Sequence, residues 1–148
     1  MQLLLDTNVL IDSYAQREPF VENAVLLRIA SCFGDVDLWA CSQSFPDVEY
    51  VLRRAIPASE LRLMMSKSLE FLSVCTISAS DVRDGLKSGW QDLEDFYIAS
   101  AAMRIGADYV ITRDCGGFAN SDVPALSPKG FFELMKDEHG VLYDSVAL

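Results

Sequence analysis

Histidine and closely spaced cysteines are almost absent from this sequence. Its one histidine, His139, lies in a polar stretch near the end, and its 4 cysteines, at positions 32, 41, 75 and 115, show no Cys-x-x-Cys spacing. Zinc sites and dithiol redox motifs are built from such residues at short spacings. We therefore expect ordinary reduced cysteines, no zinc site and an exposed histidine without a catalytic role.

Positive charge and long apolar runs are also scarce. The 12 basic residues against 22 acidic ones give a net charge of -10, which would repel a polyanion and argues against a nonspecific nucleic-acid binder. The apolar run at residues 3–5 ends at Asp6, too early for a signal peptide or a membrane span. We expect a cytoplasmic protein with no membrane contact.

Hydrophobic residues, by contrast, make up 51% of the 148 residues, which is enough to form a buried core. They are spread along the whole chain, and we find no repeat, low-complexity stretch or linker. A chain of this length is too short for two ordinary domains. We expect a single domain over residues 1–148.

Short apolar segments alternate with segments of helical periodicity. Leu3-Leu4-Leu5, for example, ends at the polar turn Asp6-Thr7-Asn8, as a buried parallel strand would. Strands are predicted at residues 3–5, 36–41, 74–77, 109–112 and, at an edge, 124–126; helices are predicted at residues 19–33, 45–56, 59–71, 80–86, 92–105 and 128–135. Ser59 is expected to cap the third helix. This alternation predicts right-handed crossovers and a three-layer α/β sandwich with a mostly parallel central sheet.

Carboxylates stand where ligands bind in such folds, at the carboxyl ends of the strands. Asp6 follows the first predicted strand and Asp114 follows the fourth. Asp92 and Asp95 open a predicted helix and, three residues apart, lie roughly on one face. Their alternative role is to stabilise the helix N-terminus through its dipole.

A further acidic pair stands between these segments. Asp47 belongs to Ser44-Phe45-Pro46-Asp47, which also has the form of a capping box. Its role is therefore either to cap the helix or to serve the site. Glu49 lies two residues on, roughly on another face, and a solvated surface is its alternative position.

Carboxylates that converge on one crevice repel one another unless they are protonated or neutralised by a cation. Hard oxygen donors of this kind suit Mg²⁺ or Mn²⁺ rather than zinc. Without a histidine base, the chemistry indicated is metal-assisted hydrolysis of a phosphodiester.

The order of these segments resembles the PIN-domain family. The resemblance runs from residue 1 to about residue 135, through the Asp-Thr-Asn, Ser-Phe-Pro-Asp, Asp-Leu-Glu-Asp and Thr-Arg-Asp motifs that begin at residues 6, 44, 92 and 112. It implies metal-binding roles for Asp6, Asp95 and Asp114, with Asp92 as a neighbouring carboxylate. Asn8 and Thr112 would orient the site by hydrogen bonds.

Two positions depart from the family pattern. The middle acid of the family is usually glutamate; the matching residue here is Asp47, which is one methylene shorter, and Glu49 is the reserve candidate. The loop after the last motif often reads Lys-Asp-Phe in the family, whereas Cys115-Gly116-Gly117-Phe118 follows Asp114 here.

The compact size looks like VapC-type toxins, which implies an endoribonuclease held inactive by an antitoxin, and a homodimer. An acidic toxin surface would suit an antitoxin with a basic segment. Arg113, Arg53 and Arg54 are the cations closest in sequence to the proposed crevice and are candidates for RNA contact. For Arg113 the alternative is an ion pair with a neighbouring carboxylate, and for the other two it is a solvated helix face.

Two other interpretations stay open. A PIN-like domain that has lost its chemistry would act as a binding module, and a metal titration would separate it from the enzyme. A receiver-like or phosphatase-like domain also places an aspartate after its first strand. Such a domain needs a second acidic residue nearby and a late lysine, which Asp6-Thr7-Asn8 and the later strands do not supply.

Overall fold

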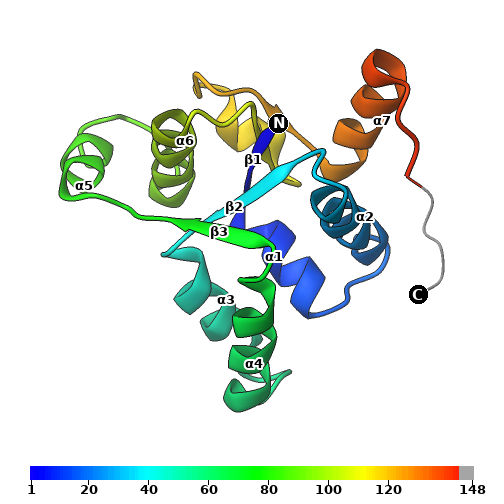
Figure 1. The fold of residues 1–148 in the computed structure, drawn as a ribbon. Helices are drawn as coiled ribbons and strands as arrows, with labels where there is room; N and C mark the ends of the chain where they lie inside the picture. Colours follow the sequence, from blue (N-terminus) through cyan, green and yellow to red (C-terminus); the bar gives the residue numbers. More distant parts are fainter. Residues whose placement is uncertain (144–148) are drawn as a thin grey trace.

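The central sheet contains five parallel strands. The computed structural model describes residues 1–143, and positions 144–148 of the predicted domain lie outside them. The strands are β1 (Gln2–Leu5), β2 (Asp37–Cys41), β3 (Leu72–Cys75), β4 (Tyr109–Ile111) and β5 (Ala125–Leu126), in the spatial order β3-β2-β1-β4-β5 (Figure 1). Every pairing is parallel. The predicted α/β fold is confirmed, and the sheet is parallel throughout.

Helices cover both faces of this sheet (Figure 1). One face packs against α1 (Thr7–Tyr14), α2 (Val21–Cys32), α3 (Ser44–Leu52), α4 (Ala58–Ser68) and α7 (Pro128–His139). The other packs against α6 (Leu93–Ile105), with α5 (Ala79–Gly85) beside that helix, and a short 3-10 helix, η1 (Cys115–Phe118), follows β4. None of the helices in residues 1–143 is both long and apolar enough to cross a membrane.

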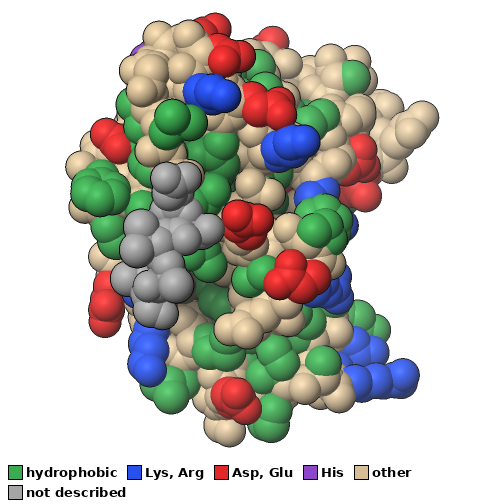
Figure 2. All heavy atoms as spheres, turned by 90° about the vertical axis from the view of Figure 1, so that its right-hand side faces the viewer, with side chains coloured by type: hydrophobic (Ala, Val, Ile, Leu, Met, Phe, Trp, Pro, Cys, Tyr) green, Lys and Arg blue, Asp and Glu red, His purple; other side chains and the backbone are tan. Residues whose placement is uncertain are grey.

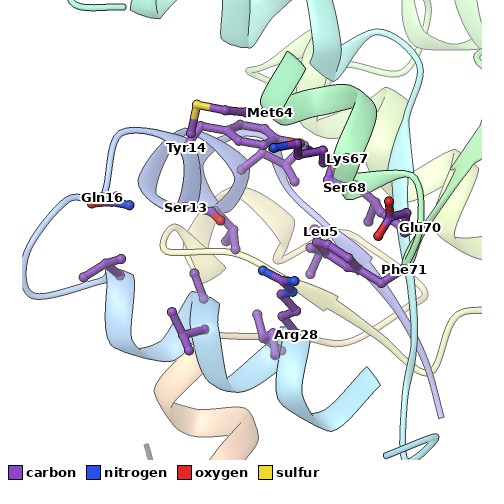
Figure 3. A pocket seen from close by; sticks show the side chains of 17 residues that line it. Leu5, Ser13, Tyr14, Gln16, Arg28, Met64, Lys67, Ser68, Glu70 and Phe71 are labelled. Carbon is purple, nitrogen blue, oxygen red and sulfur yellow. Dashed lines mark hydrogen bonds between the residues drawn. The ribbon is translucent and has the colours of Figure 1, made fainter. Parts of the chain in front are cut away.

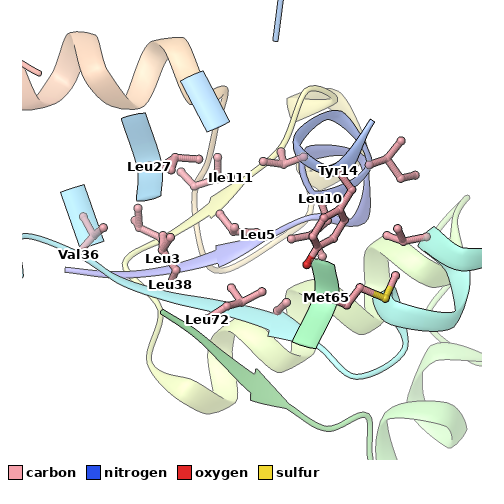
Figure 4. Packing of buried hydrophobic residues seen from close by; sticks show 14 of the residues in the cluster. Leu3, Leu5, Leu10, Tyr14, Leu27, Val36, Leu38, Met65, Leu72 and Ile111 are labelled. Atoms are coloured by element: carbon pink, nitrogen blue, oxygen red, sulfur yellow. The ribbon is translucent and has the colours of Figure 1, made fainter. Parts of the chain in front are cut away.

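The side chains of β1 alternate between two cores. Leu3 and Leu5 pack with Leu38 and Ile111 in the larger core (Figure 4), whereas Leu4 packs in the smaller core beneath α6. Successive residues of a strand point to opposite faces, so a strand covered on both sides needs an apolar residue at every position. The double cover explains the uninterrupted leucine run.

The helix α1 is not predicted by the sequence pattern. The polar segment after β1 is expected to be a turn, but Asp6 is the last extended residue and the chain enters α1 directly. Leu10 and Tyr14 of this helix are buried in the larger core. A helix of 8 residues is marginal in isolation, so this burial is what stabilises it. The next helix begins at Val21 rather than near Pro19.

One predicted helix cap is wrong, and a capping box that the sequence leaves open as an alternative is absent. Ser59 lies inside α4 instead of before it. The expected capping box from Ser44 to Asp47 is also absent, because the residue before α3 is Gln43 and it makes no capping bond. The Ser44 hydroxyl instead shares a buried 2.8 Å hydrogen bond with the Thr7 hydroxyl. This bond joins the start of α3 to the start of α1.

Apolar, acidic and basic side chains are mixed on the face shown in Figure 2, which carries α2 and α7. The acidic excess of the sequence, -10 in all, therefore does not form one continuous patch on that face. The candidate site residues Asp6 and Asp114 lie instead at the carboxyl edge of the sheet, after β1 and β4.

Candidate functional site

Asp6 lies at the centre of a hydrogen-bond network where β1 and β4 end. Leu5 is opposite Ile111 in the sheet, so the residues that follow these strands, Asp6 and Thr112, are neighbours. The Thr112 hydroxyl and the Asn8 side-chain amide both donate to Oδ2 of Asp6, at 2.6 and 2.7 Å. Asp6 is only 5% exposed and Thr112 is fully buried. The structure thus brings three predicted site residues together.

Thr112 and Asn8 also fix the loop after β4. The Thr112 hydroxyl accepts a hydrogen bond from the backbone N–H of Asp114 at 3.0 Å. The carbonyl oxygen of the Asn8 side chain accepts one from the N–H of Arg113 at 3.2 Å, while its amide nitrogen also donates to Thr112 at 3.1 Å. An aspartate at position 8 would lack the donor that reaches Asp6. Through these contacts Asn8 and Thr112 orient the Asp6 side chain and the backbone at Asp114.

Asp95 and Asp114 converge on the backbone of Gly117. The N–H of Gly117 donates to Oδ1 of Asp114 at 3.3 Å. A Cβ atom on Gly117 would lie 2.3 Å from Oδ2 of Asp95 and 3.5 Å from Oδ2 of Asp114. The glycine that departs from the family pattern therefore leaves the space that the Asp95 carboxylate occupies.

Asp92 has the helix-stabilising role that is the alternative in the sequence analysis. It is the residue before α6, and its Oδ1 accepts the backbone N–H groups of Glu94 and Asp95 at 2.8 and 3.2 Å. This cap fixes the first turn of α6, and with it the position of Asp95. The negative charge of Asp92 still acts on Asp95, as the pKa of that carboxyl shows.

Burial and, after it, crowded negative charge raise the pKa of two carboxyl groups. The pKa of Asp6 is raised to about 6, mainly by burial and then by the charges of Glu94 and Asp114. The pKa of Asp95 is also raised to about 6, mainly by burial and then by the charges of Asp92, Asp6 and its other acidic neighbours. A nearby like charge disfavours ionisation. Carboxylates from β1, α6 and the loop after β4 therefore share one electrostatic environment.

Glu94 joins this group, although the sequence analysis gives it no role. Its charge raises the pKa of both Asp6 and Asp95. Its Oε1 is buried and has no hydrogen-bond partner among residues 1–143. Glu94 is part of the Asp-Leu-Glu-Asp motif. Its position two residues after the helix cap, however, gives no reason in the sequence to expect a buried carboxylate oxygen.

The two candidates for the middle acid have different surroundings. Asp47 lies in the first turn of α3, half-buried, and accepts hydrogen bonds from the Gln43 side chain at 3.1 and 3.3 Å. The two carboxylate oxygens of Glu49 accept hydrogen bonds from two nitrogens of the Arg62 guanidinium, at 2.6 and 2.7 Å. Glu49 lines a separate surface groove, together with Phe45, Pro46, Tyr50, Arg53, Arg62 and Met65.

Arg113 binds a buried aspartate that the sequence analysis missed. Its Nε lies 2.6 Å from Oδ2 of Asp12, and its guanidinium lies over the Phe20 ring, 4.6 Å from the centre. Asp12 is 2% exposed; burial raises its pKa, and the charges of Arg113 and Arg17 lower it. Asp12 is one turn after Asn8 on α1, so helical spacing would have found it had α1 been predicted.

Arg53 and Arg54 are placed differently from Arg113. Arg53 lies over the Tyr50 ring, 3.8 Å from its centre, in the groove of Glu49. Arg54 is exposed. Within the described part of the chain, neither makes a hydrogen bond or ion pair with Asp6, Asp95 or Asp114. The solvated helix face expected as their alternative fits this placement.

A large cavity lies away from these carboxylates. Its volume is about 550 Å³, and residues of α1, α2 and α4 and of the segment leading into β3 line it, among them Tyr14, Arg28, Met64 and Phe71 (Figure 3). None of the candidate site carboxylates borders it. The candidate site is therefore defined by converging charge and hydrogen bonds, and not by depth.

The site has the donors that a hard divalent cation binds. No group of three or more Asp, Glu, His or Cys side chains in residues 1–143 is arranged to hold a metal ion as it stands. Three observations nevertheless fit such an ion: the unpartnered buried oxygen of Glu94, the approach of the Asp95 and Asp114 carboxylates to one another at Gly117, and an all-carboxylate donor set, which suits Mg²⁺ or Mn²⁺.

The fold and site together define a three-layer α/β domain with an acidic centre at the carboxyl edge of its parallel sheet. Residues 2–116 match the sequence profile of the PIN domain, and the chain belongs to that family. The resemblance seen in the sequence motifs is thereby confirmed. No curated protein is similar enough in sequence to count as a match.

Several solved structures share this fold. A chain of VapBC2 from Rickettsia felis, bound to a DNA fragment from their promoter, superposes with a TM-score of 0.63 at 15% identity, covering 86% of this chain and 98% of that one. A chain of FitAB bound to the IR36 DNA fragment gives 0.61 at 22% identity, covering 85% and 94%. FitAcB from Neisseria gonorrhoeae gives 0.60 at 20%, covering 86% and 98%. At these identities the similarity is one of fold.

Proposed function

We propose that this protein is a Mg²⁺- or Mn²⁺-dependent endoribonuclease and the toxin of a toxin-antitoxin pair. PIN domains are typically nucleases. The observation that carries the proposal is that Asp6, Asp95 and Asp114, from three separate segments, are near enough for their charges to act on one another, with the carboxylates of Asp95 and Asp114 both beside Gly117. The VapBC2 and FitAB similarities support the toxin assignment through the shared fold.

Each residue has a stated part in this proposal. Asp6, Asp95 and Asp114 would hold the divalent ion, which, when bound, supplies an activated water and stabilises charge on the phosphate. Glu94 and Asp92 would add negative charge to the ion's surroundings. Asn8 and Thr112 keep Asp6 oriented by both donating to the same carboxylate oxygen, Oδ2.

Asp47 is the middle acid in this proposal. The Ser44–Thr7 hydrogen bond holds the first turn of α3 beside the start of α1, and Asp47 is in that turn. Glu49, in contrast, is committed to Arg62. Replacing Asp47 with alanine should therefore reduce cleavage more than replacing Glu49 with alanine.

The purified protein is expected to cleave RNA with Mn²⁺ or Mg²⁺ and to stop when EDTA removes the ion, because clustered carboxylates repel one another until a bound cation offsets their charge. The assay uses a mixed pool of structured and unstructured RNAs, read by gel or sequencing. Binding of Mn²⁺ to the same protein is measured by titration. Well-folded protein that binds Mn²⁺ but cleaves no RNA would contradict the substrate class, and protein that does neither would indicate a silent binding module.

Arg113 is expected to contact the RNA backbone near the cleaved bond, because its side chain is 34% exposed and adjoins Asp114. Removing it alone would leave the buried Asp12 with only the longer, 3.9 Å ion pair to Arg17, so the test is the double variant Asp12→Asn, Arg113→Ala. The KM for RNA should rise about tenfold. The slope of log KM against the logarithm of the salt concentration should fall by about one, as expected when one phosphate contact is lost. The control is Arg53→Ala; an unchanged salt dependence in the double variant would overturn the role.

We further propose that the protein forms a homodimer and binds a small antitoxin with a basic segment. The VapC-like resemblance supports both parts, and the net charge of -10 supports the basic segment of the antitoxin. The RNA cleavage assay tests the partner: the product of a small neighbouring gene should stop cleavage at equimolar ratio, and less so at high salt. Light scattering in solution gives the mass, and a monomer would contradict the dimer.

A further inference from the structure

Two cysteines far apart in the sequence lie side by side in the sheet. Cys41 ends β2 and Cys75 ends β3, directly opposite one another in the parallel register. Their sulfur atoms are 3.8 Å apart. Both are buried in the smaller core, with exposures of 1% and 6%. The sequence predicts unrelated thiols, but the structure makes these two a dithiol, while Cys32 and Cys115 are exposed.

The register meets the geometric requirement of a disulfide. Neighbouring strands lie about 4.8 Å apart, and disulfides join Cα atoms separated by about 4.4–6.8 Å. The two side chains point to the same face of the sheet, toward α6. Rotation about the side-chain bonds can therefore join the sulfurs while the backbones of β2 and β3 stay paired.

Cys75 is the better nucleophile of the two. It lies on the edge strand of the sheet, and the guanidinium of Arg104 is held nearby by the carbonyl oxygen of Thr76 at 2.7 Å and by Asp81. The hydrogen bond from Cys41 lowers the pKa of Cys75, and the charge of Arg104 lowers it further, against the opposing effect of burial. The same hydrogen bond and burial raise the pKa of Cys41.

We propose that Cys41 and Cys75 form an oxidation site, at which hydrogen peroxide converts the dithiol to an intramolecular disulfide. Because Cys75 is only slightly exposed, its oxidant must be small, and hydrogen peroxide is both small and uncharged. A bulky, charged disulfide such as oxidised glutathione would have to approach a sulfur that is 6% exposed. The pair includes none of the candidate nuclease residues, although Cys41 is close enough to Asp6 for that charge to act on it, and the proposal does not depend on the proposed function.

The reaction balances in two steps. The Cys75 thiolate attacks one peroxide oxygen, so that a sulfur–oxygen bond forms, the oxygen–oxygen bond breaks, and the departing hydroxide takes a proton to become water. The Cys41 sulfur then attacks the sulfur of Cys75, which forms the disulfide and expels hydroxide. This hydroxide takes the Cys41 proton. The two thiols lose two electrons and two protons, and the peroxide becomes two waters.

The bond would reinforce the sheet edge next to the candidate site. The N–H of Ser42 donates to the carbonyl oxygen of Cys75 at 2.8 Å, so β2 and β3 stay paired up to the start of the α3 segment. The cysteines are 34 positions apart, and the disulfide would close a loop that contains α3 and α4. Closing such a loop should raise the Tm by on the order of 10 °C.

The test treats the intact protein with hydrogen peroxide, then unfolds it and alkylates the remaining thiols. The measurements are intact mass, peptide mapping and Tm. A Cys32→Ser background is used, because trypsin leaves Cys32 and Cys41 in the same peptide, residues 29–53. The expected product has lost two hydrogens, resists alkylation at two thiols, and links the Cys41 peptide to the Cys75 peptide.

Single variants decide the mechanism. In Cys41→Ser, Cys75 should react with peroxide and stop at a sulfenic acid that dimedone traps, whereas in Cys75→Ser, Cys41 should stay reduced. Cys41 and Cys75 that remain fully alkylatable after peroxide treatment, while exposed Cys115 is oxidised, would overturn the proposal. So would a linkage between Cys115 and either buried cysteine in place of the predicted one.

Discussion

Replacing Asp6 with asparagine should abolish RNA cleavage and at the same time stabilise the metal-free protein at pH 8. Asp6 is 5% exposed, and this burial, together with the negative charges of Glu94 and Asp114, raises its pKa to about 6. Asparagine has nearly the same shape and its carbonyl oxygen can still accept the bonds from Asn8 and Thr112, but it carries no charge. Cleavage should fall at least about 100-fold, more than the loss caused by removing an outer partner of a metal ligand.

The stability gain has a defined pH dependence. The pKa of Asp6 is about 6 in the folded protein, against an ordinary value of 3.8. Its contribution to stability is therefore fully present below about pH 4 and is lost as the pH rises through about 6. The Asp6→Asn variant has no ionisable group at this position and therefore does not lose this stability as the pH rises. At pH 8 it should be more stable by about 3 kcal/mol, or on the order of 10 °C in Tm, and at pH 4 the two proteins should unfold alike.

Thermal unfolding of both proteins at pH 4 and pH 8, with EDTA and with Mn²⁺, provides the measurement. Mn²⁺ at pH 8 should raise the Tm of the wild type much more than that of the variant, since a bound cation reverses the repulsion. The control is Asp137→Asn, which removes an exposed charge on α7. Equal Tm values for Asp6→Asn and wild type at pH 8 in EDTA would show that the charge of Asp6 does not destabilise the folded protein.

Much of the fold follows from local sequence patterns. The uninterrupted Leu3-Leu4-Leu5 run predicts a strand covered on both faces, and the structure confirms it. Asp6 and Asp114 are predicted as site residues because strand ends in a parallel sheet meet at one edge. The helix α1 is not predicted, because its first turn is polar and its stability comes from burying Leu10 and Tyr14 against distant elements.

Contacts between distant segments account for the rest. Nothing local indicates that Arg113 meets Asp12, that Glu94 is near enough to Asp6 to raise its pKa, or that Cys41 lies beside Cys75; in each case the sheet register and helix packing bring the residues together. The Gly116-Gly117 loop is the clearest case. In the sequence it is a departure from the family pattern, and in the structure it is where two aspartates converge.

Gly117→Ala should reduce cleavage about 10- to 100-fold with little change in Tm. The added Cβ would lie 2.3 Å from Oδ2 of Asp95, so the Asp95 carboxylate, at the end of a rotatable side chain, must move away. A displacement of this size at a catalytic group costs about two orders of magnitude in rate. The backbone of Gly117 is not in the left-handed region, so alanine adopts it without strain, and the folded protein should keep its stability.

Gly116→Ala is the matched control, because its Cβ would meet only Oδ1 of Asp114, at 3.4 Å, an ordinary contact. It should cleave RNA at nearly the wild-type rate and bind Mn²⁺ normally, whereas Gly117→Ala should bind Mn²⁺ more weakly. Equal activity of the two alanine variants would mean that Asp95 does not need its present position. Loss of activity only in Gly117→Ala, with both proteins equally stable, would mean that the loop departing from the family pattern shapes the metal site directly.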